Sequence, residues 1–566
     1  MTVTPQRRRL IIALILIPVF IGALDLTIVS AILPEVLTRL NIPIDTNLGL
    51  AAWAITGYLL AYTVSMVIMG RISDLVGRRS VYLICLAIFV AGSWWVASSS
   101  DFPTDLLNTI ARQVLHERPD LNQLTLIAVI IGRIIQALGA GAMVPVSMAL
   151  IGDLYPRDKR AQPIGLIGAL DTAGWVLGHL YGGVMVKFFN DHGVEIAQAL
   201  HSSIPDWHTL FWINVPIGIL AFALTAFALR GVAHPAGQGR FDVIGAALIG
   251  AALIALSLGL GGSSDVSTTT SLATVSSQAA ALPLNLPVLI GALVCFIAFL
   301  AWEWITHDPL IDLHLFRKRN VAASSLTNLV VGFCLMLGLV SVPLLVNLRA
   351  ENASSDSIAQ AAQQAGILLS AFTIPMALAA IPGGSLSNRI GYRATVLIGV
   401  GLAMIGFLAA GLTWRADTPD LLMAAEMIVA GVGLGLTISP VGTAVINEAN
   451  EQQRGVTSAL VIVLRLVGMT VAVSSMTAYA LGRVNQMVNA IVAAYPADLS
   501  TAEIQARSVT AYFSSAIHAV DELLLIGAAA CLLAFIPAMF MRGNPHIQKR
   551  EPSLERPRAD VLSAGD

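Results

Sequence analysis

The stretch RRRLIIALILIPVFIGALDLTIVSAILP, residues 7–34, decides the fold. From Leu10 to Pro34 it is almost wholly apolar, and its charged exception is Asp25, near the middle. An apolar run of about 20 residues is long enough to cross a bilayer core of roughly 30 Å. Signal peptides are shorter and end at a small-residue cleavage site, whereas this run continues past Asp25. The stretch therefore predicts a retained first membrane helix.

Asp25 is the first candidate functional residue. A carboxylate at this depth is costly to keep charged, so it usually faces a bundle interior and has a functional role. The alternative is a static role, in which Asp25 only hydrogen-bonds a neighbouring helix.

Composition places the whole chain in a membrane. Of its 566 residues 56% are hydrophobic and 12% are charged, with a mean hydropathy of +0.78; this is typical of a polytopic membrane protein. The formal net charge of −2 gives no reason to expect nucleic acid. We expect no metal site, no disulfide and no catalytic residues, because the cysteines are unpaired in apolar segments and no hydrolase or nucleotide-binding motif is present.

Charge bias predicts the topology of fourteen candidate spans. An even number of spans puts both termini on one side, and 22 of the 32 Lys and Arg residues fall on that side against 8 on the other. Cytoplasmic loops carry the excess of basic residues, so both termini are predicted to be cytoplasmic.

The spans divide into four parts. We expect a six-helix half over residues 1–230, two additional linker helices over 231–320, a second six-helix half over 321–541 and a cytoplasmic tail over 542–566. The helical pattern of the last two spans continues past the bilayer, which predicts an extended outer hairpin over about 483–516. A hairpin without any role in transport is the alternative.

Two outer segments depart from minimal loops. Residues 101–121 carry apolar side chains on one face and predict a short amphipathic helix at the interface. Residues 263–281 are rich in Ser and Thr and predict a loose loop.

The loop between the second and third spans carries the first family motif. The sequence GRISDLVGRR, residues 70–79, matches GxxxDxxGRR and so resembles the cytoplasmic motif of the major facilitator superfamily. Its glycines permit a tight turn and close helix approach. The resemblance implies a cytoplasmic latch between the two halves, made by Gly70, Asp74, Gly77, Arg78 and Arg79. A weaker echo over 384–393 has Asn388 in place of the acid, as duplicated transporter halves predict.

Two further motifs lie in the fourth and fifth spans. Arg133 begins RIIQALGAG, which resembles the RxxQGxG pattern of the same superfamily; a role in proton transfer or cavity shape and a purely structural role both remain open. The fifth span resembles the GxxxGPxxGG antiporter motif, with His179 at the proline position. A titratable group at that position and a simple packing histidine are both compatible with the pattern. The small residues predict close helix packing, and they are Gly174, Gly178, Gly182 and Gly183.

The chain is also similar to one branch of the superfamily. ALDLTIVSAILP (23–34) and FWINVPIG (211–218) resemble the fourteen-span drug:proton antiporters. VIVLRLVGM (461–469) and RVNQ (483–486) resemble the mycobacterial triacylglyceride exporters that work with a periplasmic lipoprotein. The resemblance implies an all-α fold of two six-helix halves plus two additional central helices, in the plasma (inner) membrane of a prokaryote.

The same resemblance implies three coupling residues, Asp25, Asp171 and Arg465. Each is a lone charge deep in an apolar helix, and opposite charges at such depth are cheapest when paired. Two acids that compete for Arg465 would suit a proton switch or ion lock, and a static buried cluster is the alternative.

These observations favour a proton-coupled exporter of triacylglyceride-like lipids, or other large hydrophobic molecules, by alternating access. A multidrug:proton antiporter of the same fold is the alternative, and a non-transporting membrane receptor or scaffold is a remote one. The expected partners are a lipid or hydrophobic substrate, membrane lipids and a periplasmic lipoprotein. No cofactor is expected, because the proton gradient supplies the energy.

Overall fold

The computed structural model describes residues 4–42, 44–116, 119–200, 204–232, 239–260, 285–349, 355–496 and 500–542. Within these ranges the chain is helical and contains no strand. The expected Ser/Thr-rich loop at 263–281 and the tail from 543 onward lie outside the described residues.

Six long helices form the N-terminal half. They are α1 (Pro5–Arg39), α2 (Ile44–Val76), α3 (Arg78–Ala97), α5 (Leu121–Leu154), α6 (Ala161–Leu200) and α7 (Trp207–Ala228). A short helix, α4 (Phe102–Ile110), continues into a π-helical turn (Ala111–Leu115), where the amphipathic helix was expected. Ile110 and Val114 are exposed on this segment, as an interfacial helix requires.

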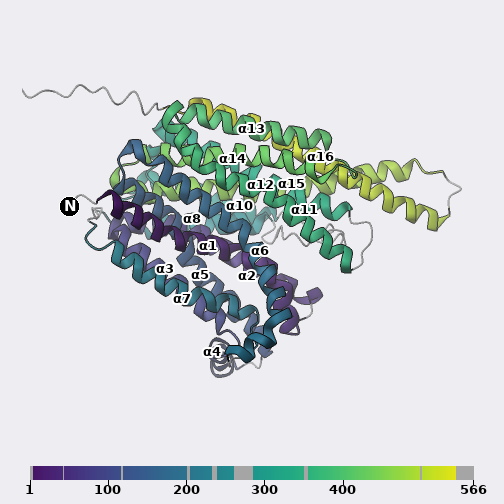
Figure 1. The fold of residues 1–566 in the computed structure, drawn as a ribbon, viewed down its shortest axis with the longest axis horizontal. Helices are drawn as coiled ribbons and strands as arrows, with labels where there is room; N and C mark the ends of the chain where they lie inside the picture. Colours follow the sequence, from purple (N-terminus) through teal and green to yellow (C-terminus); the bar gives the residue numbers. More distant parts are fainter. Residues whose placement is uncertain are drawn as a thin grey trace, which may run out of the picture.

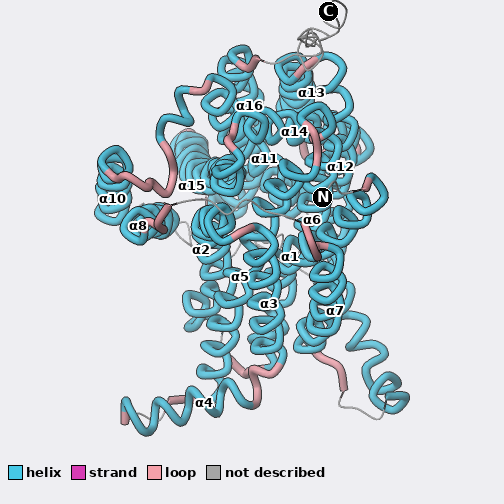
Figure 2. The backbone as a smooth tube through the Cα atoms, turned by 90° about the vertical axis from the view of Figure 1, so that its left-hand side faces the viewer, coloured by secondary structure: helices cyan, strands magenta, loops and turns pink. Residues whose placement is uncertain are grey.

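The C-terminal half repeats this arrangement. It comprises α11 (Arg319–Arg349), α12 (Ser355–Ile390), α13 (Tyr392–Thr413), α14 (Asp420–Glu448), α15 (Arg454–Ala493) and α16 (Thr501–Phe540). Between the halves in sequence come α8 (Val243–Gly259) and α10 (Leu286–Ile305). These two helices pack on each other, and α8 contacts α2 at one side of the bundle (Figure 2).

Twelve helices built from described residues are long and apolar enough to cross a membrane. Helix α8 and a part of α6, Leu180–Phe189, are shorter apolar helices. The fourteen predicted spans are thus compatible with the structure, while length and composition alone support twelve.

The two halves meet at one end and diverge toward the other. Helix α1 begins at the end where the halves converge (Figure 1). We call this end the terminal face. At the opposite end α15 and α16 project together well beyond the other helices, and we call that end the hairpin face (Figure 1).

Candidate functional site: a sealed terminal face and two buried ion pairs

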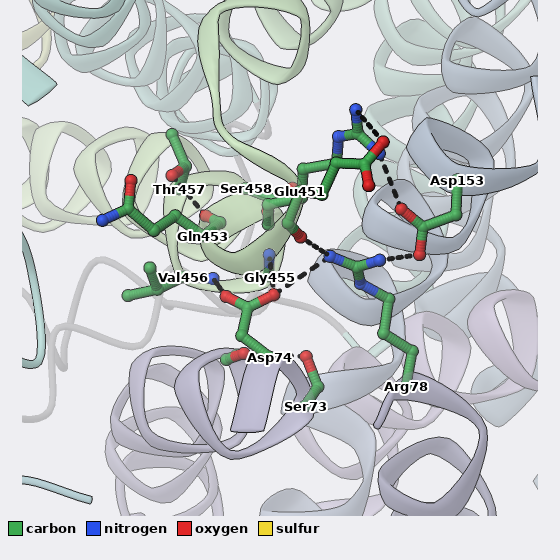
Figure 3. Close-up of polar contacts among 12 residues, drawn as sticks. Ser73, Asp74, Arg78, Asp153, Glu451, Gln453, Gly455, Val456, Thr457 and Ser458 are labelled. Carbon is green, nitrogen blue, oxygen red and sulfur yellow. Dashed lines mark hydrogen bonds and ion pairs between the residues drawn. The ribbon is translucent and has the colours of Figure 1, made fainter. Parts of the chain in front are cut away.

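The terminal face is sealed by a carboxylate that caps a helix of the other half. Asp74, near the end of α2, accepts hydrogen bonds from the backbone amides of Gly455 (2.9 Å) and Val456 (3.0 Å) at the start of α15 (Figure 3). The first amides of a helix have no partner within the helix and carry the positive end of its dipole. Asp74 therefore supplies the cap that α15 itself lacks, because Gln453 makes no side-chain capping bond.

The two backbones approach each other closely at this seal. A Cβ atom on Gly70 would lie 2.9 Å from the carbonyl oxygen of Gly455, and one on Gly455 would lie 2.5 Å from the Ser73 hydroxyl. Real Cβ atoms are not found at such distances, so glycine is required on both sides. The motif's glycines thus bring α2 and α15 close enough for Asp74 to reach the amides.

Arginines extend the seal into a network that joins both halves. Arg78 donates to Asp74 (3.1 Å) and to the Glu451 carbonyl oxygen (2.5 Å), and it also pairs with Asp153 at the end of α5. Asp153 in turn accepts from Arg454 (2.7 Å) of the C-terminal half. Figure 3 shows Asp74 and Asp153 on either side of the Arg78 guanidinium.

A second, less charged seal lies at the start of α6. There Arg160 donates to Asn447 (2.7 Å) of α14, and Ser439 donates to the Ala161 carbonyl oxygen (2.5 Å). Gly384, from the weak motif echo, packs against the Ala161 backbone as Gly70 packs against Gly455. Burial lowers the pKa of Arg160 to about 10, so it stays charged near neutral pH. In this second seal the arginine donates to the amide of Asn447, whereas in the first seal the arginines pair with carboxylates. The second motif likewise has Asn388 at the position where the first motif has Asp74.

Asp25 lies in a fully buried polar cluster inside the N-terminal half. Its carboxylate pairs with Arg133 of α5 and accepts from the Asn214 side chain of α7 at 3.0 Å. Arg133 also donates to the Asp25 carbonyl oxygen (3.0 Å) and to Gln136 (2.7 Å), and it stacks 3.9 Å from the ring centre of Tyr58. Both charged side chains are fully buried. Such a pair is tolerated because nearly every polar atom in it is satisfied.

Asp171 and Arg465 form the second buried pair, and it bridges the two halves. Arg465 of α15 donates to Asp171 of α6 at 3.0 Å, and both side chains are at least nine-tenths buried. Each residue lies ten or eleven positions from the terminal-face end of its helix, which is about 15 Å at 1.5 Å per residue. That depth is about half of a 30 Å bilayer core.

A small cavity adjoins this second pair. It has a volume of about 30 Å³ and lies between helices of both halves, with Asp171, Arg465 and Asn328 on its wall. One carboxylate oxygen of Asp171, Oδ1, has no hydrogen-bond partner. A volume of this size can hold one water molecule.

The structure corrects one part of the sequence interpretation. We expected Asp25 and Asp171 to compete for Arg465, but Asp25 has its own partner, Arg133, in the same half. Arg133 comes from α5, which packs directly against α1, whereas Arg465 sits at the seam between the halves. The two acids therefore occupy separate ion pairs.

The chain matches the family model of the Major Facilitator Superfamily over residues 15–350 and 352–564. It belongs to this superfamily. It is 30% identical to the triacylglyceride transporter of Mycobacterium tuberculosis strain H37Rv. This alignment spans 565 residues and covers 97% of this chain and 98% of the relative. It is 31% identical to the triacylglyceride transporter of Mycobacteroides abscessus. This alignment spans 513 residues and covers 87% of this chain and 88% of the relative.

Solved Major Facilitator Superfamily structures share the fold. The human organic anion transporter MFSD10 superimposes with a TM-score of 0.56 at 14% identity, covering 94% of this chain and all of that one. The proton:xylose symporter XylE superimposes with a TM-score of 0.54 at 13% sequence identity. The superposition covers 94% of this chain and 95% of XylE. These structures show that the chain has the expected all-α superfamily fold. The family model and the relatives named triacylglyceride transporters indicate a membrane transporter and not an enzyme.

The glycines of the fifth-span motif lie against α1. A Cβ atom on Gly174 would lie 2.6 Å from that of Ala23, one on Gly178 would meet the Leu24 carbonyl oxygen, and one on Gly182 would lie 3.0 Å from Ile28 oxygen. Gly183 has no neighbour within 4 Å and so is not needed for packing. His179 belongs to α6, but its side chain lies outside the described residues.

Helices α15 and α16 form the hairpin that names the hairpin face. Each has 40 residues and so is about 60 Å long, twice a bilayer core. Apolar side chains pack between them beyond the bundle, among them Val484, Met487, Tyr512 and Ala516. Glu522 of α16 accepts from Arg483 (2.8 Å) and Tyr479 (2.8 Å) of α15, which fixes the register of the two helices.

Sequence reasoning missed Asp153, Arg454 and Asn214. A signal for the first two was present, because RG at 454–455 and RA at 160–161 follow corresponding spans of the two halves. Asn214 lies in the quoted FWINVPIG stretch, but only the structure shows that it faces Asp25.

Proposed function

We propose that the chain is a proton-coupled exporter of triacylglyceride-like lipids that works by alternating access. It would reside in the plasma membrane of a prokaryote with its terminal face in the cytoplasm, as the charge bias favours. The lipid assignment is supported by the relatives named triacylglyceride transporters, which align over nearly the whole chain.

The observation that carries the coupling proposal is the Asp171–Arg465 pair between the halves. While Asp171 is ionised, its attraction to Arg465 joins α6 to α15 near the membrane centre. Protonation removes that attraction and leaves a buried arginine without a counter-ion, which is unfavourable in this environment. Arg465 would then shift its contacts, and the halves would become free to rock.

Asp25 would act as a second titrating site inside the N-terminal half. Its partner Arg133 and the donor Asn214 hold the ionised form in place. A proton on Asp25 weakens the contacts of α1 with α5 and α7, which changes the shape of that half. The described structure, with its terminal face sealed by Asp74, would be the state that is open toward the hairpin face.

The hairpin would serve the release of substrate. A triacylglyceride is too apolar to leave the bilayer unaided, since burial of each CH₂ group is worth about 0.8 kcal/mol. An exporter of such a molecule needs an apolar path beyond the membrane or an acceptor that docks there. The projecting α15–α16 pair would guide the lipid or dock a periplasmic lipoprotein.

The test is transport of labelled triacylglyceride in proteoliposomes with and without a pH gradient, for wild type and Asp25→Asn. Flux that requires the gradient and is lost in Asp25→Asn supports the proposal. Lipid flux that is unaffected by Asp25→Asn removes Asp25 from the mechanism. Movement of ethidium without lipid flux assigns the chain to the multidrug:proton antiporters instead.

A further inference from the structure

Two buried carboxylates meet at the terminal-face end of the additional helix pair. Asp242 directly precedes α8 and is 8% exposed, while Glu303 lies near the end of α10 and is 4% exposed. A Cβ atom on Gly245 would lie 2.3 Å from Oδ2 of Asp242 and 2.7 Å from Oε1 of Glu303, so both oxygens crowd the same point. Neither acid has a part in the proposed transport mechanism.

Asp242 is surrounded by hydrogen-bond donors. It caps α8 by accepting from the backbone amide of Gly245 at 2.8 Å, and the indole nitrogen of Trp302 lies 3.0 Å from both of its oxygens. The start of a helix also favours a negative charge, through the helix dipole. All of these groups stabilise a carboxylate, so Asp242 is the ionised member of the two acids.

Glu303 has the opposite surroundings. Its Oε2 accepts from the Ile311 amide at 3.3 Å, while its buried Oε1 has no donor among the described residues. Two adjacent buried carboxylates cannot both stay ionised at low cost, because their charges repel each other. A proton on Oε1 removes this repulsion and makes Oε1 a donor toward Oδ2 of Asp242. A metal cation does not suit this position, because the N–H groups of Gly245 and Trp302 already point at Asp242 and would repel it.

A second partner for Glu303 lies across a cavity at the terminal face. The cavity has a volume of about 360 Å³, and both Glu303 of α10 and Arg71 of α2 border it. Arg71 is 8% exposed, and its Nε has no hydrogen-bond partner among the described residues. A buried guanidinium is costly without a counter-ion. An ionised Glu303 that turned away from Asp242 into the cavity would supply one.

We propose that Asp242 and Glu303 share a proton and form a pH-sensitive switch in the additional helix pair. With the proton bound, Glu303 donates to Asp242 and ties α10 to α8. When the pH rises at the terminal face, Glu303 releases the proton to solvent, is repelled by Asp242 and pairs with Arg71 instead. Arg71 lies three residues before Asp74 on α2, so this exchange ties α10 to the helix that carries the latch motif.

Other charged and titratable groups surround the switch. Besides Asp242 and Arg71, they come from the chain before α8 and after α10, and they are Arg240, His307, Asp308, Asp312 and His314. Both of these further acids have partners of their own, since Asp308 accepts from the Arg240 amide and Asp312 pairs with His314. A histidine can change its charge near neutral pH, so the test includes variants of both histidines.

The test is infrared spectroscopy of the detergent-purified full chain at a series of pH values, because a protonated carboxyl group absorbs apart from a carboxylate. We expect a carboxylic-acid band that disappears as the pH rises and that is missing in Glu303→Gln. Asp242→Asn removes the neighbouring negative charge, so the band should disappear at a pH that is lower by about one unit or more. Arg71→Gln removes the attracting positive charge, so the band should persist to a pH that is higher by a similar amount.

The matched control is Glu426→Gln, which removes another buried carboxylate, one whose two oxygens already accept from Thr413 and Trp414. It should leave the band and its pH dependence unchanged. His307→Gln and His314→Gln should do the same, since neither histidine contributes a carboxyl group.

Three outcomes overturn the proposal. They are the absence of any pH-sensitive acid band, a band that survives in Glu303→Gln, and shifts of the same sign in Asp242→Asn and Arg71→Gln. A merely structural role of the two acids gives no reason for opposite shifts, so the pair of variants separates that role from the switch.

A second readout follows the exchange of partners without changing either acid. Leu75 of α2 borders the cavity, whereas Val76 is 58% exposed. We expect maleimide to label a cysteine at Leu75 severalfold more slowly, relative to one at Val76, once the pH is high enough for Glu303 to pair with Arg71. The ratio of the two rates cancels the pH dependence of thiol reactivity. A ratio that does not change with pH contradicts the exchange. Neither readout requires transport, so failure here leaves the transport proposal untouched.

Discussion

Arg465 of α15 donates a 3.0 Å hydrogen bond to Asp171 of α6, and this bond crosses from one half of the transporter to the other. The Asp25–Arg133 pair, in contrast, lies wholly within the N-terminal half. The two acids therefore differ in what their protonation releases. In the proposed mechanism, protonation of Asp171 would weaken the contact between the halves, while protonation of Asp25 would weaken the contacts of α1 within one half.

Asp171→Asn should uncouple the two halves. The amide keeps the shape of the side chain but leaves Arg465 buried without a counter-ion, and removing one partner of a buried pair costs about 3–5 kcal/mol. We expect the sealed state to lose population and pH-driven transport to fall at least tenfold. Transport in proteoliposomes checks this, and the double variant Asp171→Asn with Arg465→Gln should recover stability but not the pH dependence. A single variant that transports with wild-type pH dependence would contradict a coupling role.

Asp74→Asn should open the terminal face. An asparagine can still accept one amide bond from α15, but it loses the charge that complements the helix dipole and Arg78. Loss of a helix cap costs about 0.5–2 kcal/mol, so the open state should gain a few-fold to about thirtyfold in population. The labelling rate of a cysteine at Ser439 measures the change. Asn388→Ala is the matched control, because this position in the second motif carries no charge, and it should change the rate by less than twofold.

Gly455→Ala should break the same seal by steric means. The added methyl group would lie 2.5 Å from the Ser73 hydroxyl and closer still to the Gly70 carbonyl oxygen, so α2 and α15 must move apart. We expect a lower thermal midpoint and faster cysteine labelling at the terminal face. Gly183→Ala serves as control, since nothing lies within 4 Å of that position. Equal thermal midpoints for the two variants would show that the close approach of Gly70 and Gly455 is not needed.

The fold was largely predictable from sequence because membrane helices are encoded locally. Each needs a long apolar run, and the charge bias of the loops orders the runs in space. The motif at 70–79 also carries its own geometry, since Gly70 and Asp74 lie one helical turn apart on α2. The apolar runs, the loop charges and the motif all involve residues close together in the chain, so they can be recognised in a single sequence.

The pairing of the buried charges was not predictable in the same way. Asp25, Arg133, Asp171 and Arg465 come from four different helices, and any acid with any arginine would satisfy the same electrostatic rule. Only the packing of α1 against α5 decides that Asp25 takes Arg133. The partners of Asp74 could not be predicted for a related reason. They are the backbone amides of Gly455 and Val456, and nearly every residue carries such an amide whatever its side chain.

Deletion of residues 484–492 together with 504–512 should separate release of lipid from the transport cycle itself. This shortens α15 and α16 by matched lengths and keeps Arg483 with its partner Glu522, so the base of the hairpin stays closed. If the hairpin guides lipid or docks an acceptor, the variant keeps pH-dependent labelling at Ser439 but loses most export of triacylglyceride. A second variant replaces the same residues with a helical Ala/Glu/Lys sequence, which keeps the length of the hairpin but removes its apolar surface. Comparing the two variants shows whether export depends on the length or on the apolar surface. Export at the full wild-type rate from the shortened protein would show that the projecting helices have no part in transport.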